Sequence, residues 1–249
     1  MHHINATYKG KKRFYTAPES WNELSKRQLL IWCGVIRQRV PVNLAFSTAT
    51  ALIYGMPLRI YNMLTEAQQS ELNHTLSFLK KENRLTSNVI GSFRILWMKY
   101  IGPSGRLASL SIGDYRRAEI YYQLYLKQED PFLLNLLAAT LFKRSDKPDS
   151  DKSVARRARF FRLANPNILH AILLFYEGCR EYIHKSFPRI FVKPNPNSPQ
   201  PVQSNTILDF EEIILAVSGG KFGNFKYTQE VPLYTFLKHL DQEMERAKK

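Results

Sequence analysis

The segment PFLLNLLAATLF, residues 131–142, constrains the fold most strongly because it is apolar on nearly every face. A helix with no polar side has to be buried, so we expect this one at the centre of a helical core. Asp130 precedes it as an N-cap, and Pro131 takes the first helical position, where the missing amide costs nothing. Neighbouring helices must therefore supply the apolar faces that cover it.

Two further helices flank this segment along the chain. Ser111 is followed three residues later by Asp114, so a hydroxyl and a carboxylate can each satisfy a free amide at the start of a helix over residues 112–128. Asn165 and Pro166 repeat the cap signature before the long apolar-striped segment NILHAILLFYEGCREYIHK. Residues 111–187 therefore predict three helices and one basic loop.

The first part of the chain carries its own start signals. Ser25 with Gln28, and Thr65 with Gln68, match the capping-box pattern, and we expect a helix after each. Between them, the apolar segment 42–54 predicts a further helix. Alternating residues on both sides of Lys9-Gly10-Lys11 predict a small β-hairpin.

Two other segments give weaker signals. Residues 85–110 fit either a pair of strands or a loop packed by Trp97 and Tyr100. Near the end of the chain, a single helix is expected from about residue 228 to residue 246, with Leu233, Phe236 and Leu237 on one stripe.

Together these elements predict a mainly α protein, a multi-helix globular domain with a small N-terminal β-hairpin. The predicted helical domain covers residues 1–192 and opens with the hairpin at residues 1–16. Residues 193–205 hold four prolines and no aromatic, leucine, isoleucine or methionine side chain, which is typical of a linker. Residues 206–249 are expected to form a helical appendage that packs on the main domain.

The formal net charge of +15 indicates an acidic partner: nucleic acid, an acidic protein surface or anionic lipid. Two cysteines, Cys33 and Cys179, fall at apolar helical positions, which favours buried thiols in a reducing compartment. We expect no signal peptide, no transmembrane segment and no membrane partner.

Positive charge is most concentrated between residues 143 and 162, and this segment is the predicted polyanion- or partner-binding site. Phe160 and Phe161 lie beside its arginines, where they either stack on bases or, as the favoured interpretation, anchor a short helix to the core. A nucleic-acid-binding face would extend to others such as Arg37, Arg39, Lys80 and Lys81. The eight basic residues of the site are Lys143, Arg144, Lys147, Lys152, Arg156, Arg157, Arg159 and Arg162.

Catalytic and metal-binding patterns are weak. Two Glu-x-x-His pairs resemble half of a di-metal bundle site, but helical geometry turns His74 away from the apolar face of its helix, and the second pair lies beside its own stripe. The glycine-rich residues 218–223 lack phosphate-loop spacing. We therefore expect no metal, no cofactor and no enzymatic activity. The two pairs are Glu71 with His74 and Glu181 with His184.

Several phrases resemble tail-region proteins of bacteriophages and prophages of Bacteroidetes. They are the opening YKGKKRFYTAPESWNELSKRQLL, the helix pair LSIGDYRRAEIYYQLYLKQEDPFLLNLLAATLF, the segment LLFYEGCREYIHKSFPRIF and the final GGKFGNFKYTQEVPLYTFLKHLDQEMERA. The resemblance implies a non-enzymatic protein of virion or tail structure or assembly, found in the host cytoplasm or the virion, that contacts other phage assembly or virion proteins. Binding of nucleic acid through the basic segment is the alternative function.

Overall fold

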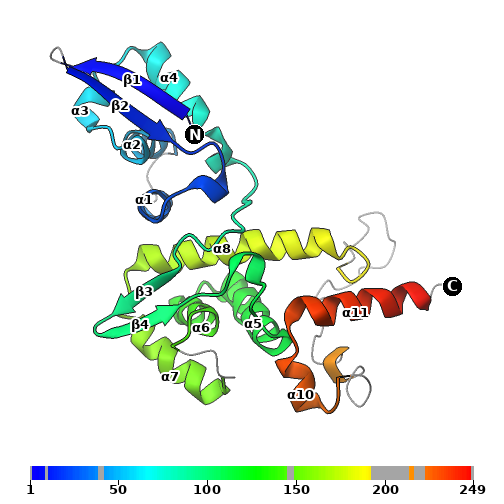
Figure 1. Ribbon diagram of the computed structural model, residues 1–249. Coiled ribbons are helices and arrows are strands. Elements are labelled where there is room, and N and C mark those ends of the chain that lie inside the picture. Colours follow the sequence, from blue (N-terminus) through cyan, green and yellow to red (C-terminus); the bar gives the residue numbers. More distant parts are fainter. Residues whose placement is uncertain are drawn as a thin grey trace. The chain divides into compact units, whose positions relative to one another are not determined.

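The computed structural model describes residues 2–8, 11–38, 42–144, 149–191, 213–215 and 222–247. The protein is mainly α-helical with an N-terminal antiparallel hairpin, which confirms the predicted fold class (Figure 1). The chain forms two compact units. The first consists of residues 1–90 and 165–178, and the second of residues 91–164 and 179–249.

The first unit begins with the hairpin of β1 (His2–Tyr8) and β2 (Lys11–Ala17). The strands pair antiparallel, with His2 opposite Ala17 and Tyr8 opposite Lys11. Tyr15 and Ala17 are buried, and β2 packs on α2 (Val42–Tyr54). The hairpin thus covers a helix, which supplies the apolar surface that two strands alone lack.

Both predicted capping boxes are present in this unit. At the start of α1 (Lys26–Ile36), the Gln28 amide donates to the Ser25 hydroxyl, and the Ser25 amide donates to the Gln28 side chain over 2.9 Å. Thr65 and Gln68 make the same reciprocal bonds before α4 (Glu66–Thr75). Short elements complete this part of the chain: η1 (Trp21–Glu23), α3 (Leu58–Tyr61) and η2 (Ser77–Lys80).

The first part of α8 (Pro166–Ser186) belongs to this unit and is held by the segment after η2. The Asn83 side chain donates to the Leu174 carbonyl over 2.7 Å. At Gly178 the helix meets the backbone of Leu85, and a Cβ atom there would lie 2.3 Å from the Leu85 carbonyl oxygen. This approach is possible because residue 178 has no side chain.

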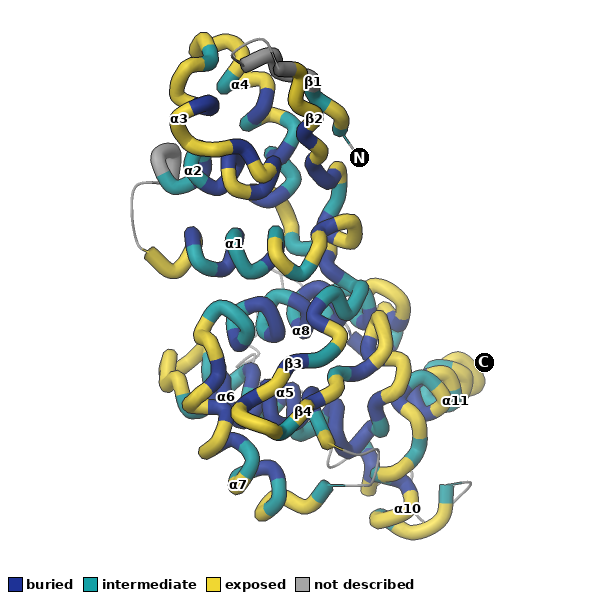
Figure 2. Tube along the Cα trace, turned by 60° about the vertical axis from the view of Figure 1, so that its left-hand side comes forward, coloured by how far each residue is buried: buried dark blue, intermediate teal, exposed yellow. Residues whose placement is uncertain are grey.

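In the second unit, α5 (Ile112–Gln128), α6 (Pro131–Leu141) and α7 (Asp151–Phe161) pack in sequence order. Every residue from 133 to 141 is buried, as the apolar pattern predicts, and α6 appears largely in dark blue in Figure 2. The predicted caps are present: the Asp114 amide donates to Ser111 Oγ, and the Phe132 amide to Asp130 Oδ1.

Within residues 85–110 the structure has a pair of strands rather than a packed loop. β3 (Ser92–Ile95) pairs antiparallel with β4 (Met98–Ile101), and Phe93 lies opposite Tyr100. Both rings turn inward, where Phe161 of α7 lies 5.4 Å from Phe93 and 4.8 Å from Tyr100 between ring centroids. The hairpin is therefore fixed to α7 by an aromatic cluster. The short helix η3 (Gly105–Leu107) follows.

The predicted single helix at the end of the chain is wrong, since the structure has α10 (Phe225–Glu230) and α11 (Leu233–Arg246) instead. Pro232 causes the break, because it has no amide and it disfavours the helical conformation at Val231, whose ψ is 135°. The segment at the break is hydrogen-bonded to the start of α5. The Ile112 amide donates to Val231 O over 2.9 Å, and the Leu233 amide to Leu110 O over 2.8 Å.

The division into two units differs from the predicted domain boundaries. It falls after residues 90 and 164 and, within α8, between residues 178 and 179. Local patterns report helix starts and ends but not which helices pack together, so a long helix shared by two units is read as part of one domain. The predicted linker at residues 193–205 lies outside the described residues, as do residues 206–212 and 216–221 of the predicted appendage.

Candidate functional site

The structure separates the eight predicted basic residues into groups with different surroundings. Lys143 and Arg157 are largely buried, with 15% and 12% of their side chains exposed. Lys147 lies outside the described residues. The predicted site is therefore not one continuous set of available cations. The exposed members are Arg144, Lys152, Arg156, Arg159 and Arg162.

Lys143 is held beside β4 and neutralised by two carboxylates. Its backbone exchanges two hydrogen bonds with Ile101, of 2.8 and 3.0 Å. Its Nζ lies 2.6 Å from Asp114 Oδ2 and 3.8 Å from Asp149 Oδ2. A buried ammonium needs such partners, so we assign Lys143 to the fold rather than to a ligand.

Arg157 has a similar structural role on the inner side of α7. Its Nε donates to the Ala139 carbonyl of α6 over 2.8 Å, and its terminal nitrogens bind both oxygens of Asp149. Burial raises the pKa of the Asp149 carboxyl, but hydrogen bonds from Arg157 and Ser153 outweigh burial and hold that pKa below its ordinary value. The bond to Ala139 docks α7 on α6, and Asp149 holds the Arg157 guanidinium in the position that makes it.

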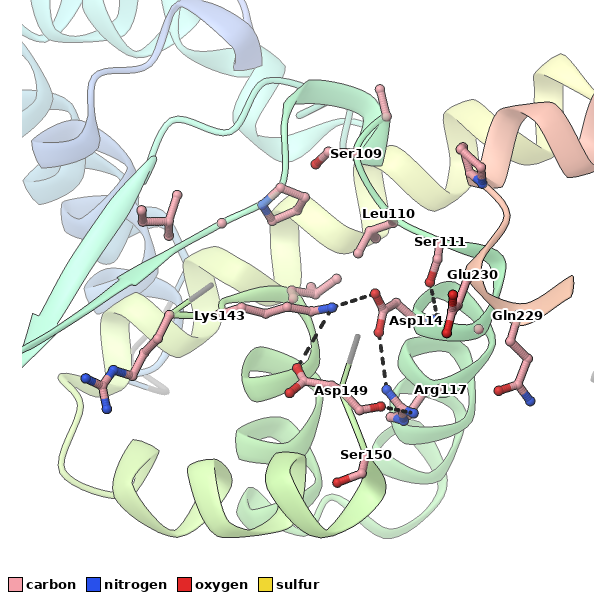
Figure 3. A pocket seen from close by; sticks show the side chains of 18 of the residues that line it. Ser109, Leu110, Ser111, Asp114, Arg117, Lys143, Asp149, Ser150, Gln229 and Glu230 are labelled. Atoms are coloured by element: carbon pink, nitrogen blue, oxygen red, sulfur yellow. Dashed lines mark hydrogen bonds and ion pairs between the residues drawn. The ribbon is translucent and has the colours of Figure 1, made fainter. Parts of the chain in front are cut away.

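Asp114 and Arg117 extend this network, as Figure 3 shows. The Arg117 guanidinium donates to Asp114 Oδ1 over 3.2 Å, to Asp151 Oδ1 over 2.8 Å and to the Asp149 carbonyl over 3.2 Å. Of the predicted cap at the start of α5, the hydroxyl half is confirmed. The Asp114 carboxylate instead pairs with Lys143 and Arg117, because two cations from elsewhere in the fold lie within reach.

The network lies in the wall of a cavity of about 920 Å³ between α5, β4 and α10 (Figure 3). Cations and anions alternate in this wall and largely pair with one another. The cavity consequently presents no concentrated charge of one sign that would select a charged ligand. Its charged residues are Asp114, Arg117, Lys143, Arg144, Asp149, Lys226 and Glu230.

The outer face of α7 carries cations that make no such pairs. Lys152, Arg156 and Arg159 follow at i, i+4 and i+7, which places them on one side of the helix, and all three are exposed. Phe160 belongs to the same side and is 42% exposed, whereas Phe161 is fully buried in the aromatic cluster. The favoured anchoring interpretation is thus right for Phe161, while Phe160 faces solvent.

The β3–β4 hairpin adds cations that the sequence analysis did not single out. Arg94 lies directly opposite Lys99 on the outer face, and both are exposed. At the tip, Leu96 adopts a φ of 53° and Trp97 is 83% exposed. The alternation of residues in SFRILWMKYI predicts which side chains face outward, but only once the register of the two strands is known.

The hairpin and α7 meet at a recess of about 120 Å³. Arg144 reaches across it, with its guanidinium 3.8 Å from the sulfur of Met98. Arg156 and Phe160 form the α7 side, and Met98 and Tyr100 the β4 side. The recess therefore brings β4 against Arg156 and Phe160 of α7.

We use the term basic surface for seven exposed cations of the second unit and two exposed rings. Among the described residues, no carboxylate lies within ion-pair distance of any of the seven. Figure 2 shows exposed residues in yellow along the hairpin and α7. The cations are Arg94, Lys99, Arg144, Lys152, Arg156, Arg159 and Arg162, and the rings are Trp97 and Phe160.

The remaining predicted extensions of this face belong to the first unit. There Arg37 donates to the Asn167 side chain over 2.8 Å, and Lys80 lies over the Phe46 ring at 3.8 Å. Lys81 is exposed, and Arg39 lies outside the described residues.

The two Glu-x-x-His pairs lie on separate units. Glu71 and His74 are exposed in the first unit, while in the second Glu181 pairs with Lys185 and the His184 ring stacks on Phe191 at 4.0 Å. Within the described part of the chain, no three His, Cys, Asp or Glu side chains are grouped closely enough to hold a metal ion. Residues 218–221 of the glycine-rich segment lie outside that part.

Burial raises the pKa of both cysteine thiols, Cys33 and Cys179, to about 12. Neither thiol has the depressed pKa of a reactive nucleophile.

No family model, curated protein or solved structure matches the chain. Among the helices described, none is long and apolar enough to cross a membrane. The resemblance to phage tail-region proteins therefore stays a prediction.

Proposed function

We propose that this protein is a non-enzymatic binding protein and that its basic surface binds nucleic acid. The observation that carries the proposal is the set of seven exposed cations, none paired with a carboxylate of the described residues, around two exposed aromatic rings. Lysine and arginine side chains without partners can neutralise phosphates and release their counterions. The buried Lys143 and Arg157 are left out of this role because carboxylates already neutralise them.

The exposed rings favour nucleic acid over an acidic protein as the partner. An acidic protein surface needs only opposite charge, whereas bases offer flat faces that stack on aromatic side chains. Trp97 and Phe160 lie among the cations rather than in the core. Charge and aromatic surface thus occur together, as in sites that hold a phosphate backbone and its bases.

Salt dependence of binding tests this proposal. A labelled single-stranded oligonucleotide is titrated with the full chain at several salt concentrations, and log affinity is plotted against log salt. The double variant Arg156→Gln/Arg159→Gln should lose affinity, and its slope should be smaller by about 1.4, at about 0.7 for each lost phosphate contact. Arg27→Gln/Arg59→Gln removes the same charge from exposed sites of the first unit and should leave the slope unchanged.

Two results would count against nucleic acid. One is no binding by a folded sample at low salt, and the other is an identical loss in the test and control variants. If instead an acidic polypeptide binds the surface and oligonucleotides do not, the partner is a protein.

Binding of an acidic polypeptide would correspond to the function implied by the resemblance, in which the chain acts in bacteriophage virion or tail assembly through contacts with other phage proteins. We keep it as a separate proposal, supported by the sequence phrases alone. A pull-down with acidic proteins of the same virion, compared between the native chain and Arg156→Gln/Arg159→Gln, would test it.

A further inference from the structure

The tip of the β3–β4 hairpin is a two-residue turn formed by Leu96 and Trp97. Leu96 occupies a left-handed backbone conformation with a φ of 53°, which is unfavourable for a residue with a branched side chain. The next residue, Trp97, exposes 83% of its surface, although indole rings are usually mostly buried. No described residue makes a ring contact with Trp97, so its faces are open to solvent.

Two cations lie next to the tip along the hairpin. Arg94 and Lys99 face each other across the hairpin, two positions from the tip on each strand. Like charges directly opposite on a sheet repel one another, so the pair weakens the isolated hairpin. An anion bound next to the tip would neutralise both charges at once.

A second exposed ring lies on the other side of the recess. Phe160 is 42% exposed and contributes to the recess wall with Arg144 and Arg156. Exposed rings thus occur with cations both at the hairpin tip and at the recess, which suits a strand whose phosphates and bases are both accessible.

We propose that the basic surface selects single-stranded nucleic acid, with a base stacked on Trp97 and Phe160 as a second stacking position. This inference rests on the proposed function. In a duplex the bases already stack on each other and present only their edges and the backbone, so an exposed ring at a hairpin tip finds no base face there. In a single strand the faces are available, and stacking tolerates any sequence.

Intrinsic tryptophan fluorescence provides a direct test. The chain has three tryptophans, and Trp21 and Trp32 are buried in the first unit, so Trp97 should be the one that a ligand quenches. The full chain is titrated with oligothymidylate and, separately, with a duplex of equal length. The single strand should quench the fluorescence and bind more tightly than the duplex.

Two variants at the hairpin tip separate stacking from general apolar contact. Trp97→Ala should abolish the quenching and weaken single-strand binding by roughly 5- to 150-fold, the cost of losing one stacked base. Duplex binding should change little. Leu96→Ala is the matched control because it removes apolar surface from a residue that is 61% exposed at the same tip, without removing an aromatic face.

Each outcome decides between the two proposals. Equal affinity for single strand and duplex, with no quenching, would overturn the stacking inference and leave the nucleic-acid function standing. Equal losses in Trp97→Ala and Leu96→Ala would also overturn it, in favour of simple apolar contact. A folded protein that binds neither oligonucleotide at low salt would remove the proposed function itself. Because Trp97 is exposed, its replacement leaves the core intact, and a matching thermal transition verifies this.

Discussion

Gly178 shows how one absent side chain determines a packing distance within α8. Replacing a glycine by alanine inside a helix normally stabilises the protein by about 1 kcal/mol. At position 178 the new Cβ would lie 2.3 Å from the carbonyl oxygen and 2.7 Å from the amide nitrogen of Leu85. Backbone atoms cannot rotate away, and overpacking costs about 1–3 kcal/mol. After subtracting the propensity gain, we expect Gly178→Ala to lower the free energy of unfolding by up to about 2 kcal/mol, measured by urea denaturation.

Gly34 offers a matched control in α1. Its added Cβ would meet the Asn167 side-chain nitrogen at 2.9 Å, and the end of a side chain can move. Gly34→Ala should therefore leave the free energy of unfolding within about 1 kcal/mol of the native value. A Gly178→Ala protein as stable as the native one would contradict the close approach.

At the scale of elements, the docking of α7 depends on Asp149, which binds Arg157 and Ser153 of that helix. Asp149→Asn should cost about 2 kcal/mol at pH 7, because hydrogen bonds to charged groups contribute about 1.5–3 kcal/mol. The folded pKa of Asp149 is lowered, so its stabilisation is complete above the unfolded pKa of about 3.9 and is lost as the pH falls through the folded value. Urea unfolding of both proteins between pH 7 and pH 3 measures this.

Asp151→Asn serves as the control for this series. Its side chain is 78% exposed, and its pair with Arg117 should contribute less than about 1 kcal/mol. A difference between native and Asp149→Asn proteins that stays constant down to pH 3 would show that the carboxylate charge has no part in docking α7.

Elements whose signals are local were predictable, and the site was predictable only in part. Each capping box lies within four residues, so Ser25 with Gln28 could be identified without knowledge of the fold. Whether Lys143 is neutralised depends on Asp114, which is 29 residues away along the chain and is brought close only by the packing of α5. Sequence alone could not separate such neutralised cations from exposed ones such as Arg156. The missed break at Val231 was a local signal, since Pro232 follows it.

For the molecule as a whole, the two cysteines report on the two units separately. Cys33 belongs to the first unit and Cys179 to the second, and burial raises the pKa of both thiols to about 12. At pH 8 a thiol with that pKa is about 0.01% ionised, against about a quarter of a free thiol with a pKa near 8.5. Both should react with a disulfide reagent far more slowly than in urea, when each is measured in a variant that keeps one cysteine. Rapid labelling of either in the folded protein would contradict its burial.

The like-charged pair on the β3–β4 hairpin has a consequence for how the molecule responds to its surroundings. Arg94 and Lys99 repel each other when the surface is empty, and a bound polyanion removes that repulsion. The proposed function thereby links ligand affinity to hairpin stability, and it predicts that the β3–β4 hairpin is more stable with a polyanion bound than without one. Added salt should then have two opposing effects. It should lower the affinity for the ligand, and it should stabilise the unoccupied hairpin by screening the repulsion between Arg94 and Lys99.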